Sequence, residues 1–484
     1  MSPRDQVVRL FERHFGARPA HVRELAADGS SRCYYRIPVP EGGTVIGAYG
    51  PDRRENRAFL SFASSLRDAG LPVPQVLVAD PHEGTWLESD LGDTTLFDAL
   101  SGAREAEPAG PFPDTMRDVY RRVVTLLPRF QVEGGQAIDF GLAYPRRAFD
   151  RQSMMWDLNY FKYHFLKLAQ VPFDEARLER DFGKLVRFLL QAERDHFMYR
   201  DFQSRNIMLL DGKPWFIDFQ GGRRGALQYD LASLLYDAKA DLPQDVRDEL
   251  TECYLGALGE LLAVDRARFL DHYRGFVLIR IMQAMGAYGY RGFFERKPRF
   301  LQSVPFAARN LARLVEEGLP LELPEIEAAF AEVISRWSAP ASAAPEPAGL
   351  TVQINSFSFR HGYPEDHAGH GGGYVFDCRA IDNPGRQPAF AELTGLDEPV
   401  IDFLEGRSET EAFWQQVRRL AETHIDNYRN RGLSSLSISF GCTGGQHRSV
   451  YFAERLAAHL RGAKREVAVA VRHRERSSWP QRGR

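Results

Sequence analysis

Three polar residues, Asp201, Asn206 and Asp218, stand at fixed spacings around two short apolar runs. Four residues separate Asp201 from Asn206. The runs Ile207–Leu210 and Trp215–Ile217 then follow, joined by an Asp-Gly-Lys turn, and Asp218 comes next. Two apolar runs around such a turn predict a β-hairpin, and a hairpin brings its two outer ends together. We therefore expect Asn206 and Asp218 to lie side by side, a few residues from Asp201.

These three side chains have the chemistry that phosphoryl transfer requires. A carboxylate must orient the attacking hydroxyl and accept its proton, and oxygen ligands must hold Mg²⁺ against the phosphates of ATP. We assign the first role to Asp201 and the second to Asn206 and Asp218. Asp and Asn also serve as helix caps and turn residues, but that alternative accounts less well for the joint order and spacing.

The residues before this motif predict a small twisted sheet, and those around it predict helices. Beyond residue 90 the patterns are mainly helical up to Trp337, so we expect a small lobe over about 1–90 and a helical lobe over about 91–337. In the small lobe a helix is predicted from Glu55 to about Ala69. Strands are predicted at His21–Leu25, Cys33–Val39, Thr44–Tyr49, Gln75–Ala79 and Thr85–Ser89.

Residues 1–337 resemble the aminoglycoside phosphotransferase-like kinases, and within them the cell-wall amino-sugar kinases that phosphorylate N-acetylmuramate and N-acetylglucosamine at the anomeric hydroxyl. The resemblance rests on Arg200-Asp201, Asn206, Asp218-Phe219-Gln220, Tyr229–Leu235 and Glu88–Asp93. It implies an α+β bilobal protein-kinase-like fold and an enzyme that transfers phosphate from ATP, with Mg²⁺, to a sugar hydroxyl. It also implies that Asp230 braces the catalytic loop, which is compatible with a helix N-cap at the same position.

The resemblance implies a nucleotide site in the small lobe. The turn Asp28-Gly29-Ser30-Ser31 is expected to cover the phosphates with N–H groups and hydroxyls, although a plain hairpin turn explains it equally well. Glu55 and Glu88 are also expected at this site.

One residue of such kinases is missing. They usually carry a lysine on the third strand, and Thr44–Tyr49 contains none. Arg32, Arg53 and Arg54 are three alternatives for the missing charge. The departure also favours an alternative function, in which a weak or inactive kinase half binds nucleotide in a regulatory or RNA adapter protein.

An aromatic stretch, Trp156–Phe165, precedes the catalytic motif. Its aromatic rings allow stacking on a sugar, but at helical spacing such residues are more often part of a core.

A second domain follows a linker. Ser338–Gly349 is rich in Pro and Ala and has no hydrophobic periodicity, so it predicts a semi-extended linker. Residues 350–484 then alternate between strands and helices, which predicts a smaller α/β domain. Strands are expected at Thr351–Phe357, Tyr374–Asp377 and Leu436–Phe440, and helices near Pro399–Leu404, Glu411–Arg429 and Ser449–Leu460.

The segment Gly441–Ser449 joins a strand to a helix through a glycine-rich turn. Exposed N–H groups and the helix dipole make such a turn an anion site, and Arg448 adds a guanidinium that can grip a phosphate. Cys442 and Arg448 also have the C-x5-R spacing of cysteine phosphatases. A bifunctional kinase and phosphatase with Cys442 as nucleophile is therefore an alternative, and a small buried residue at a strand end is another.

Residues 350–484 resemble the C-terminal domain of the RNase adapter proteins of the RapZ family, through Ser356–Gly362, Tyr374–Arg379, Asn383-Pro384, Leu393–Asp397, Gly441–Tyr451 and Arg472–Arg474. The resemblance implies a domain that senses a phosphorylated amino sugar. Asp377 or Arg379 would hold the sugar side, and the phosphate would be held by Thr443, Gly444, Gly445, His447 and Arg448. Gly385 stands where the family has histidine, which leaves the sugar open.

The remaining features suit a cytoplasmic protein. The net charge of −3 argues against a general nucleic-acid binder. From Arg461 onward eight Lys/Arg face two Glu, and we favour a solvated basic tail over an RNA contact. The four cysteines share no CxxC spacing, which disfavours zinc and disulfides. No apolar run reaches the roughly 20 residues of a membrane span, so no membrane partner is expected.

Overall fold

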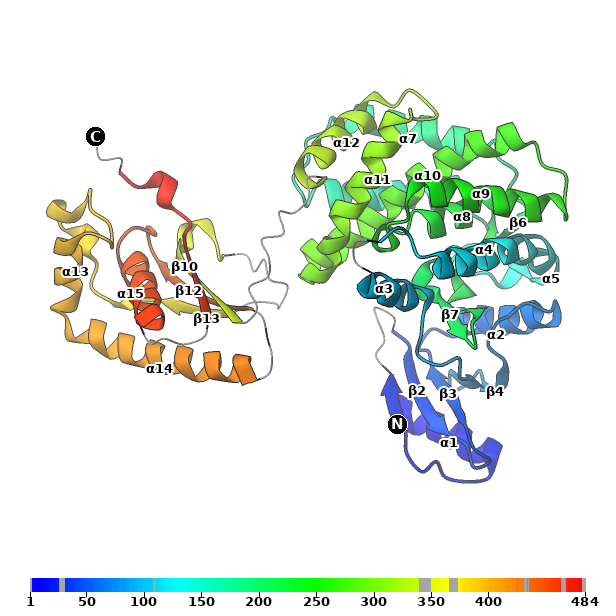
Figure 1. Ribbon diagram of the computed structural model, residues 1–484, viewed down its shortest axis with the longest axis horizontal. Coiled ribbons are helices and arrows are strands. Elements are labelled where there is room, and N and C mark those ends of the chain that lie inside the picture. The colour runs from blue at the N-terminus through cyan, green and yellow to red at the C-terminus, as the bar shows by residue number, and fades with distance from the viewer. Residues whose placement is uncertain are drawn as a thin grey trace. The chain divides into compact units, whose positions relative to one another are not determined.

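The computed structural model describes residues 2–25, 31–107, 110–338, 350–364, 373–430, 433, 435–462 and 467–480. The chain forms two compact units (Figure 1), one that holds nearly all of the chain up to Pro340 and one that runs from Ala341 to Arg484. Each unit has its own hydrophobic core.

The N-terminal lobe is a five-stranded antiparallel sheet with a helix on each face. Alternation along the strands produces this arrangement, because Leu87 faces α1 (Pro3–Phe15) while its neighbour Trp86 faces α2 (Arg53–Asp68). The strand order is β1-β2-β3-β5-β4. The strands are β1 (Arg23–Leu25), β2 (Cys33–Pro38), β3 (Thr44–Tyr49), β4 (Val76–Asp80) and β5 (Thr85–Ser89).

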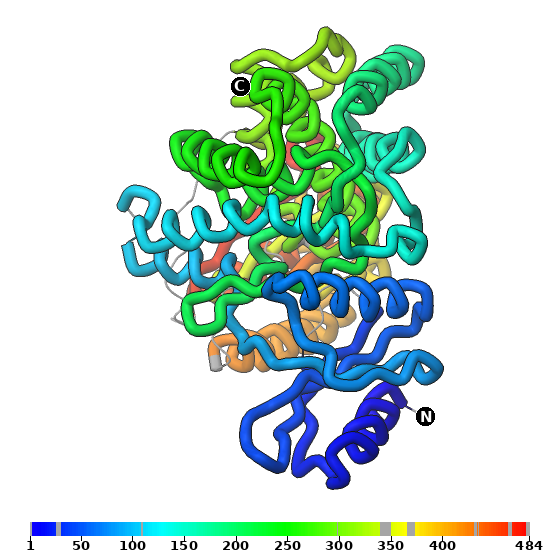
Figure 2. The backbone as a smooth tube through the Cα atoms, turned by 90° about the vertical axis from the view of Figure 1, so that its right-hand side faces the viewer, coloured from blue at the N-terminus to red at the C-terminus, as the bar shows by residue number. Residues whose placement is uncertain are grey.

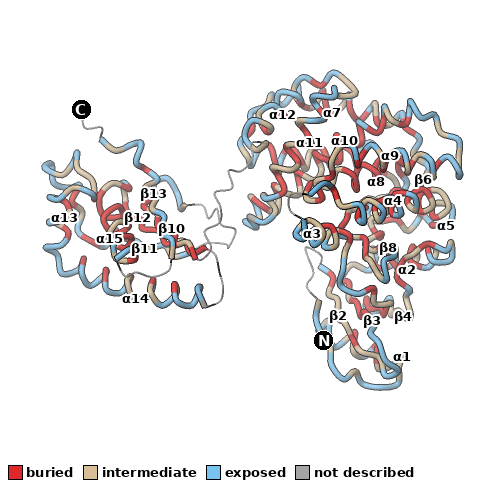
Figure 3. The backbone as a smooth tube through the Cα atoms, viewed as in Figure 1, coloured by how far each residue is buried: buried red, intermediate tan, exposed pale blue. Residues whose placement is uncertain are grey.

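The second lobe is helical and adjoins the sheet lobe (Figure 2). Its centre is α10 (Arg266–Gly289), most of whose residues beyond Asp271 are buried (Figure 3), as expected for a helix whose apolar residues are not confined to one stripe. No helix in the described part of the chain has the length and apolar content to cross a membrane. The main helices are α3 (Leu96–Ala106), α4 (Asp114–Arg129), α6 (Arg151–Phe161), α7 (Glu175–Leu189), α8 (Leu227–Leu235), α9 (Gln244–Gly259), α10 (Arg266–Gly289), α11 (Val304–Glu316) and α12 (Pro324–Trp337).

Two short antiparallel strand pairs lie beside these helices. The predicted hairpin is present as β7 (Ile207–Leu210) paired with β8 (Lys213–Phe216). A further hydrogen bond, from the Ile217 N–H to the Asn206 carbonyl at 3.1 Å, extends it by one residue. The second pair joins β6 (His196–Met198) to β9 (Arg223–Gly225). The two pairs hold the segments before and after the catalytic motif next to each other.

The C-terminal unit is a four-stranded, all-parallel sheet in the order β11-β12-β10-β13. Its strands are β10 (Leu350–Ser358), β11 (Gly373–Asp377), β12 (Ser435–Cys442) and β13 (Val467–His473), and its helices are α13 (Glu398–Glu405), α14 (Ser408–Asn430) and α15 (Arg448–Gly462). The apolar strand residues and the inner sides of α14 and α15 share one core. Because all four strands are parallel, their C-terminal ends lie at the same end of the sheet.

The prediction of a solvated basic tail is wrong for Val467–His473, which is strand β13 and pairs with β10. Val467, Val469 and Val471 pack against the core. The smaller or polar residues that alternate with them are exposed. This period-2 pattern is typical of a strand with one buried face. The prediction of a tail was based on the basic residues around it instead.

Candidate functional site

The catalytic loop is held in place by Asp230. This fully buried carboxylate accepts hydrogen bonds from the backbone N–H groups of Tyr199 (2.8 Å) and Arg200 (2.9 Å), and from the Gln131 side chain. The N-cap alternative is wrong, because α8 begins at Leu227 and Asp230 lies inside it. Burial raises the pKa of Asp230 to about 7, while these three donors favour its charged form.

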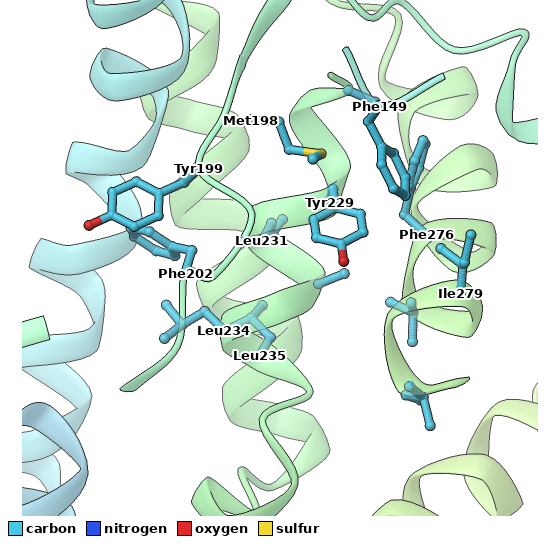
Figure 4. Close-up of a cluster of buried hydrophobic side chains, with 14 of the residues drawn as sticks. Phe149, Met198, Tyr199, Phe202, Tyr229, Leu231, Leu234, Leu235, Phe276 and Ile279 are labelled. Carbon is cyan, nitrogen blue, oxygen red and sulfur yellow. The ribbon is translucent and has the colours of Figure 1, made fainter. Parts of the chain in front are cut away.

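Apolar side chains surround the start of this loop. Tyr199 and Phe202 pack beside Leu231 and the other α8 leucines (Figure 4), and Tyr199 donates its hydroxyl to the Ile217 carbonyl at 2.6 Å. Tyr199 thus ties the loop to the strand that precedes Asp218.

Asn206 and Asp218 are adjacent, as the hairpin predicts. The Asn206 amide nitrogen donates to the Asp201 carbonyl (2.8 Å) and to Asp218 Oδ2 (3.1 Å), and the Gln220 amide donates to Asp218 Oδ1 (2.6 Å). No hydrogen bond within the described residues uses Asn206 Oδ1. An amide oxygen and a carboxylate are the hard oxygen ligands that suit Mg²⁺, so this donor set fits the metal that the motif implies.

Two carboxylates, those of Asp201 and Asp218, lie close together at this site. Burial and the nearby Asp201 carboxylate raise the pKa of Asp218 to about 6. Asp218 also has a left-handed backbone, with φ of 69°, which is uncommon outside glycine. A bound cation would relieve the repulsion between the two carboxylates.

Arg32, one of the three alternatives for the missing lysine, is buried next to α2. Its side chain is 2% exposed, its Nη2 lies 3.6 Å from Glu55 Oε1, and its guanidinium lies over the rings of Phe59 and Trp86. Glu55 belongs to α2, so a cation directly before β2 pairs with the helix glutamate. Arg53 and Arg54 are exposed.

The other predicted nucleotide residues have different surroundings. Glu88 is buried and accepts a hydrogen bond from the Trp86 indole at 3.0 Å, and burial raises the pKa of Glu88 to about 7. Ser31 is an exposed residue just before β2. Gly29 and Ser30 lie outside the described residues.

Near Asp201 lie Arg200, Arg223 and Asp157, none of which the sequence assigned to a site. Arg200 binds Asp157 through both terminal nitrogens, each at 2.7 Å, and Arg223 on β9 is 7% exposed. The aromatic stretch is divided: Phe161 and Phe165 belong to the core, whereas Trp156 is 48% exposed. Asp157 and Arg223 carry no local motif, and only the pairing of β6 with β9 places Arg223 here.

The C-terminal unit brings its predicted ligand residues to one edge of the sheet. Asp377, the last residue of β11, and Arg379, two residues later, bind each other at 2.6 to 3.0 Å. His447 and Arg448, which follow β12, contact the 378–390 segment: His447 Nε2 lies 2.9 Å from the Phe390 carbonyl, and Arg448 Nη1 donates to the carbonyls of Arg379 (3.1 Å) and Ile381 (2.7 Å).

The glycine-rich turn between β12 and α15 has free space beside Gly444. The Thr443 carbonyl accepts the Ser358 hydroxyl at 2.7 Å, and a Cβ added to Gly444 would meet nothing within 4 Å. Gly445 has φ of 67°, and its missing side chain makes room for the buried Glu475. Gly444 is exposed, and no hydrogen bond within the described part of the chain uses its N–H.

Cys442 faces inward. It is 3% exposed, its sulfur accepts the Gly445 N–H at 3.2 Å, and it lies 3.1 Å from the Ser449 hydroxyl. The sulfur therefore packs beneath the turn.

Comparisons with known families divide the chain in the same way. The model of the phosphotransferase enzyme family matches residues 21–270, more than half of the chain, and the model of the RapZ C-terminal domain matches residues 350–477.

Similar curated proteins carry the name nucleotide-binding protein. One from Shewanella halifaxensis is 43% identical over 126 residues, which are 26% of this chain and 42% of the relative. One from Methylobacillus flagellatus is 36% identical over 173 residues, 36% of this chain and 58% of the relative. The chain thus spans roughly half the length of these relatives.

Similar solved structures include choline kinase LicA from Streptococcus pneumoniae (14% identity, TM-score 0.41, covering 62% of this chain and 98% of that one) and the amicoumacin kinase hAmiN (14%, 0.45, 67% and 97%). The N-terminal unit has the protein-kinase-like fold, and a RapZ-like domain follows it in the chain. From the extent of the family match, this chain belongs to the phosphotransferase enzyme family.

Proposed function

We propose that residues 1–337 form an ATP- and Mg²⁺-dependent kinase that phosphorylates a sugar hydroxyl. The observation that carries this proposal is the adjacency of Asn206 and Asp218 next to a catalytic loop that Asp230 holds rigidly. Asp201 would orient the acceptor hydroxyl and take its proton. Asn206 Oδ1 and Asp218 would hold Mg²⁺, which when bound neutralises charge on the phosphate oxygens.

The acceptor in this proposal is an amino sugar such as N-acetylmuramate or N-acetylglucosamine, phosphorylated at the anomeric hydroxyl. The sequence resemblance to the amino-sugar kinases supports it. The exposed ring of Trp156 also supports it, because a tryptophan face packs well on the apolar face of a sugar ring.

We infer further that Arg32 takes the part of the missing strand lysine. It is the buried cation of the three alternatives, and it pairs with Glu55 on α2. The pair would hold the guanidinium toward the nucleotide phosphates, and a guanidinium can bind two phosphate oxygens at once. Arg32 therefore supports an active kinase over a domain that only binds nucleotide.

For the C-terminal domain we propose binding of a hexosamine phosphate at the edge where the strands end. Its support is the open Gly444, the N-terminus of the 15-residue helix α15, and the buried Arg448, whose Nε has no partner among the described residues. The inward position of Cys442 favours binding over a phosphatase, whose nucleophile must reach the ligand.

The test of the kinase proposal is a product assay with ATP, Mg²⁺ and a panel of sugars, followed by phosphorus NMR. We expect an anomeric phosphate that is labile to acid. A phosphate on another hydroxyl would overturn the anomeric assignment alone. Nucleotide binding with no transfer to any sugar would overturn the kinase proposal and favour a nucleotide-binding adapter.

A further inference from the structure

Arg223 is a buried cation with unused hydrogen-bond donors. It is 7% exposed, and its Nε donates to the Gly221 carbonyl at 3.0 Å. Within the described part of the chain, no hydrogen bond or ion pair engages its terminal nitrogens Nη1 and Nη2. Neither terminal nitrogen is among the buried side-chain atoms of the described residues that lack a partner, so both reach solvent and can bind a ligand.

The strand pairing holds Arg223 close to the catalytic carboxylate. Arg223 lies opposite Met198 in the β6–β9 pair, three residues before Asp201. The segment between Asp218 and β9 turns back at Gly221, where an added Cβ would lie 3.6 Å from Asp201 Oδ2. The next residue, Arg224, points away, since its side chain is 52% exposed and pairs with Asp195.

Arg223 forms no ion pair within the described part of the chain. The nearby Asp157 is already bound by both terminal nitrogens of Arg200. Burial and the like charge of Arg200 lower the pKa of Arg223 to about 10, so it remains a cation at neutral pH. Arg223 is therefore a cation whose terminal nitrogens can bind a negatively charged group of a ligand.

The two buried arginines have different partners. Arg32 pairs with Glu55 and acts electrostatically on Asp218, which we assign to the metal. Arg223 interacts electrostatically with Arg200, Asp201 and Asp157. Because Asp201 is assigned to the acceptor hydroxyl, a cation that the strand pairing holds close to Asp201 also lies near the acceptor.

We propose that Arg223 binds an acid group of the acceptor, so that the kinase prefers a sugar carrying a carboxylate over a neutral or cationic sugar. A carboxylate would accept from Nη1 and Nη2 together, the two-point geometry that arginine favours. An ammonium has no lone pair to accept hydrogen bonds from Nη1 and Nη2, and it carries the same charge as Arg223. The inference rests on the proposed function and names the acceptor's charge and the residue that selects it.

The test compares three acceptors with similar rings: N-acetylmuramate with a carboxylate, N-acetylglucosamine without one, and glucosamine with an ammonium. We expect wild-type kcat/KM to be highest for N-acetylmuramate. The Arg223→Gln variant should lose about 10- to 100-fold for N-acetylmuramate, mainly through KM, and change about threefold or less for N-acetylglucosamine. Arg224→Gln, on the same strand, is the matched control and should leave all three values unchanged.

Two further measurements keep the inference open to refutation. Arg223→Lys preserves the charge without the two-point geometry and should retain part of the preference, even if Arg223→Gln folds poorly. Equal losses for all acceptors in Arg223→Gln would overturn the inference and place Arg223 on the transferring phosphate or in the framework. So would a wild-type enzyme that prefers glucosamine.

If no sugar is phosphorylated, the proposed function fails, and the inference is then tested by binding. Calorimetry of the intact chain with N-acetylmuramate and N-acetylglucosamine, in the presence of a non-hydrolysable ATP analogue, supplies the readout. Carboxylate binding that Arg223→Gln removes would support the inference alone. Equal or absent binding of both sugars would overturn it.

Discussion

Asp230 shows how one buried carboxylate can fix a catalytic loop. Its two bonds to the N–H groups of Tyr199 and Arg200 satisfy backbone donors that have no strand partner there. Leaving such buried donors unsatisfied costs about 1–3 kcal/mol each. The left-handed backbone of Arg200, with φ of 82°, is tolerated because these bonds determine it.

The role of Asp201 is testable by truncation. Asp201→Ala should lower kcat by about 10²- to 10⁴-fold, because a positioned base contributes that much, while leaving Mg·ATP affinity nearly unchanged. Steady-state kinetics on the best sugar and calorimetry with Mg·ATP measure the two effects. Near-normal turnover in this variant would show that Asp201 is not the base.

The metal assignment makes a different prediction. Asp218→Asn should weaken Mg²⁺-dependent ATP binding by about tenfold or more, since it removes the charge of the ligand while keeping its size. Asn206→Ala should act in the same direction. Asp211→Asn, in the exposed hairpin turn, is the control for a lost carboxylate. If Asp218→Asn binds Mg·ATP as well as the control does, the assignment is wrong.

At the scale of elements, the residue that precedes β2 forms an ion pair with α2. Arg32 precedes β2 and Glu55 lies in the first turn of α2. Both rings that flank the guanidinium belong to the core, so its position is set by packing as well as by charge.

A double-mutant cycle tests this pair. Arg32→Gln and Glu55→Gln should each lower kcat/KM for ATP, and the double variant should lose less than the sum of the single losses, with a coupling free energy of about 0.5–3 kcal/mol. Arg54→Gln, exposed on α2, should have no effect. Additive losses, or a larger loss in Arg54→Gln, would contradict the assignment of Arg32.

The turn between β12 and α15 distinguishes binding from phosphatase chemistry. Arg448→Ala should weaken binding of glucosamine 6-phosphate to the intact chain by tens- to about a hundredfold, and Cys442→Ser should change it little. Calorimetry measures both. Because Arg448 also donates to the carbonyls of Arg379 and Ile381, thermal unfolding of each variant is the control.

A phosphate-release assay on the same samples completes this test. A cysteine phosphatase would release phosphate and lose that activity in Cys442→Ser, because the thiolate forms the covalent intermediate. Such a result would replace the binding role with a catalytic one.

At the scale of the whole molecule, each unit contains a complete set of the residues assigned to it. Asp201, Asn206, Asp218 and their supports all lie before residue 338. Among the described residues, the buried core of that unit ends at Val333, with Ile334 and Trp337 packed against it. The ligand residues of the C-terminal unit all follow residue 350.

A truncation tests the independence of the kinase unit. A chain that ends after Ser338 should fold and keep kcat/KM for its sugar within about threefold, because no assigned catalytic or metal residue is removed. Kinetics and thermal unfolding of the truncated chain supply the measurement. A loss of more than tenfold with an intact fold would show that the C-terminal unit acts on the kinase.

The sequence alone determined the elements that depend on local patterns. The bounds of β3, β5 and β7 agree with the predicted runs. Alternation and turn residues are local patterns that extend over only a few positions. The adjacency of Asn206 and Asp218 was also predictable, since the hairpin between them is local.

Only the tertiary structure decided the features that depend on distant neighbours. It buried Arg32 and left Arg53 and Arg54 exposed, and it placed Arg223 inward and Arg224 outward. In each case the outcome depends on which surface the side chain is buried against. Burial and pairing across the sheet are set by residues far away in sequence, so no local pattern contains them.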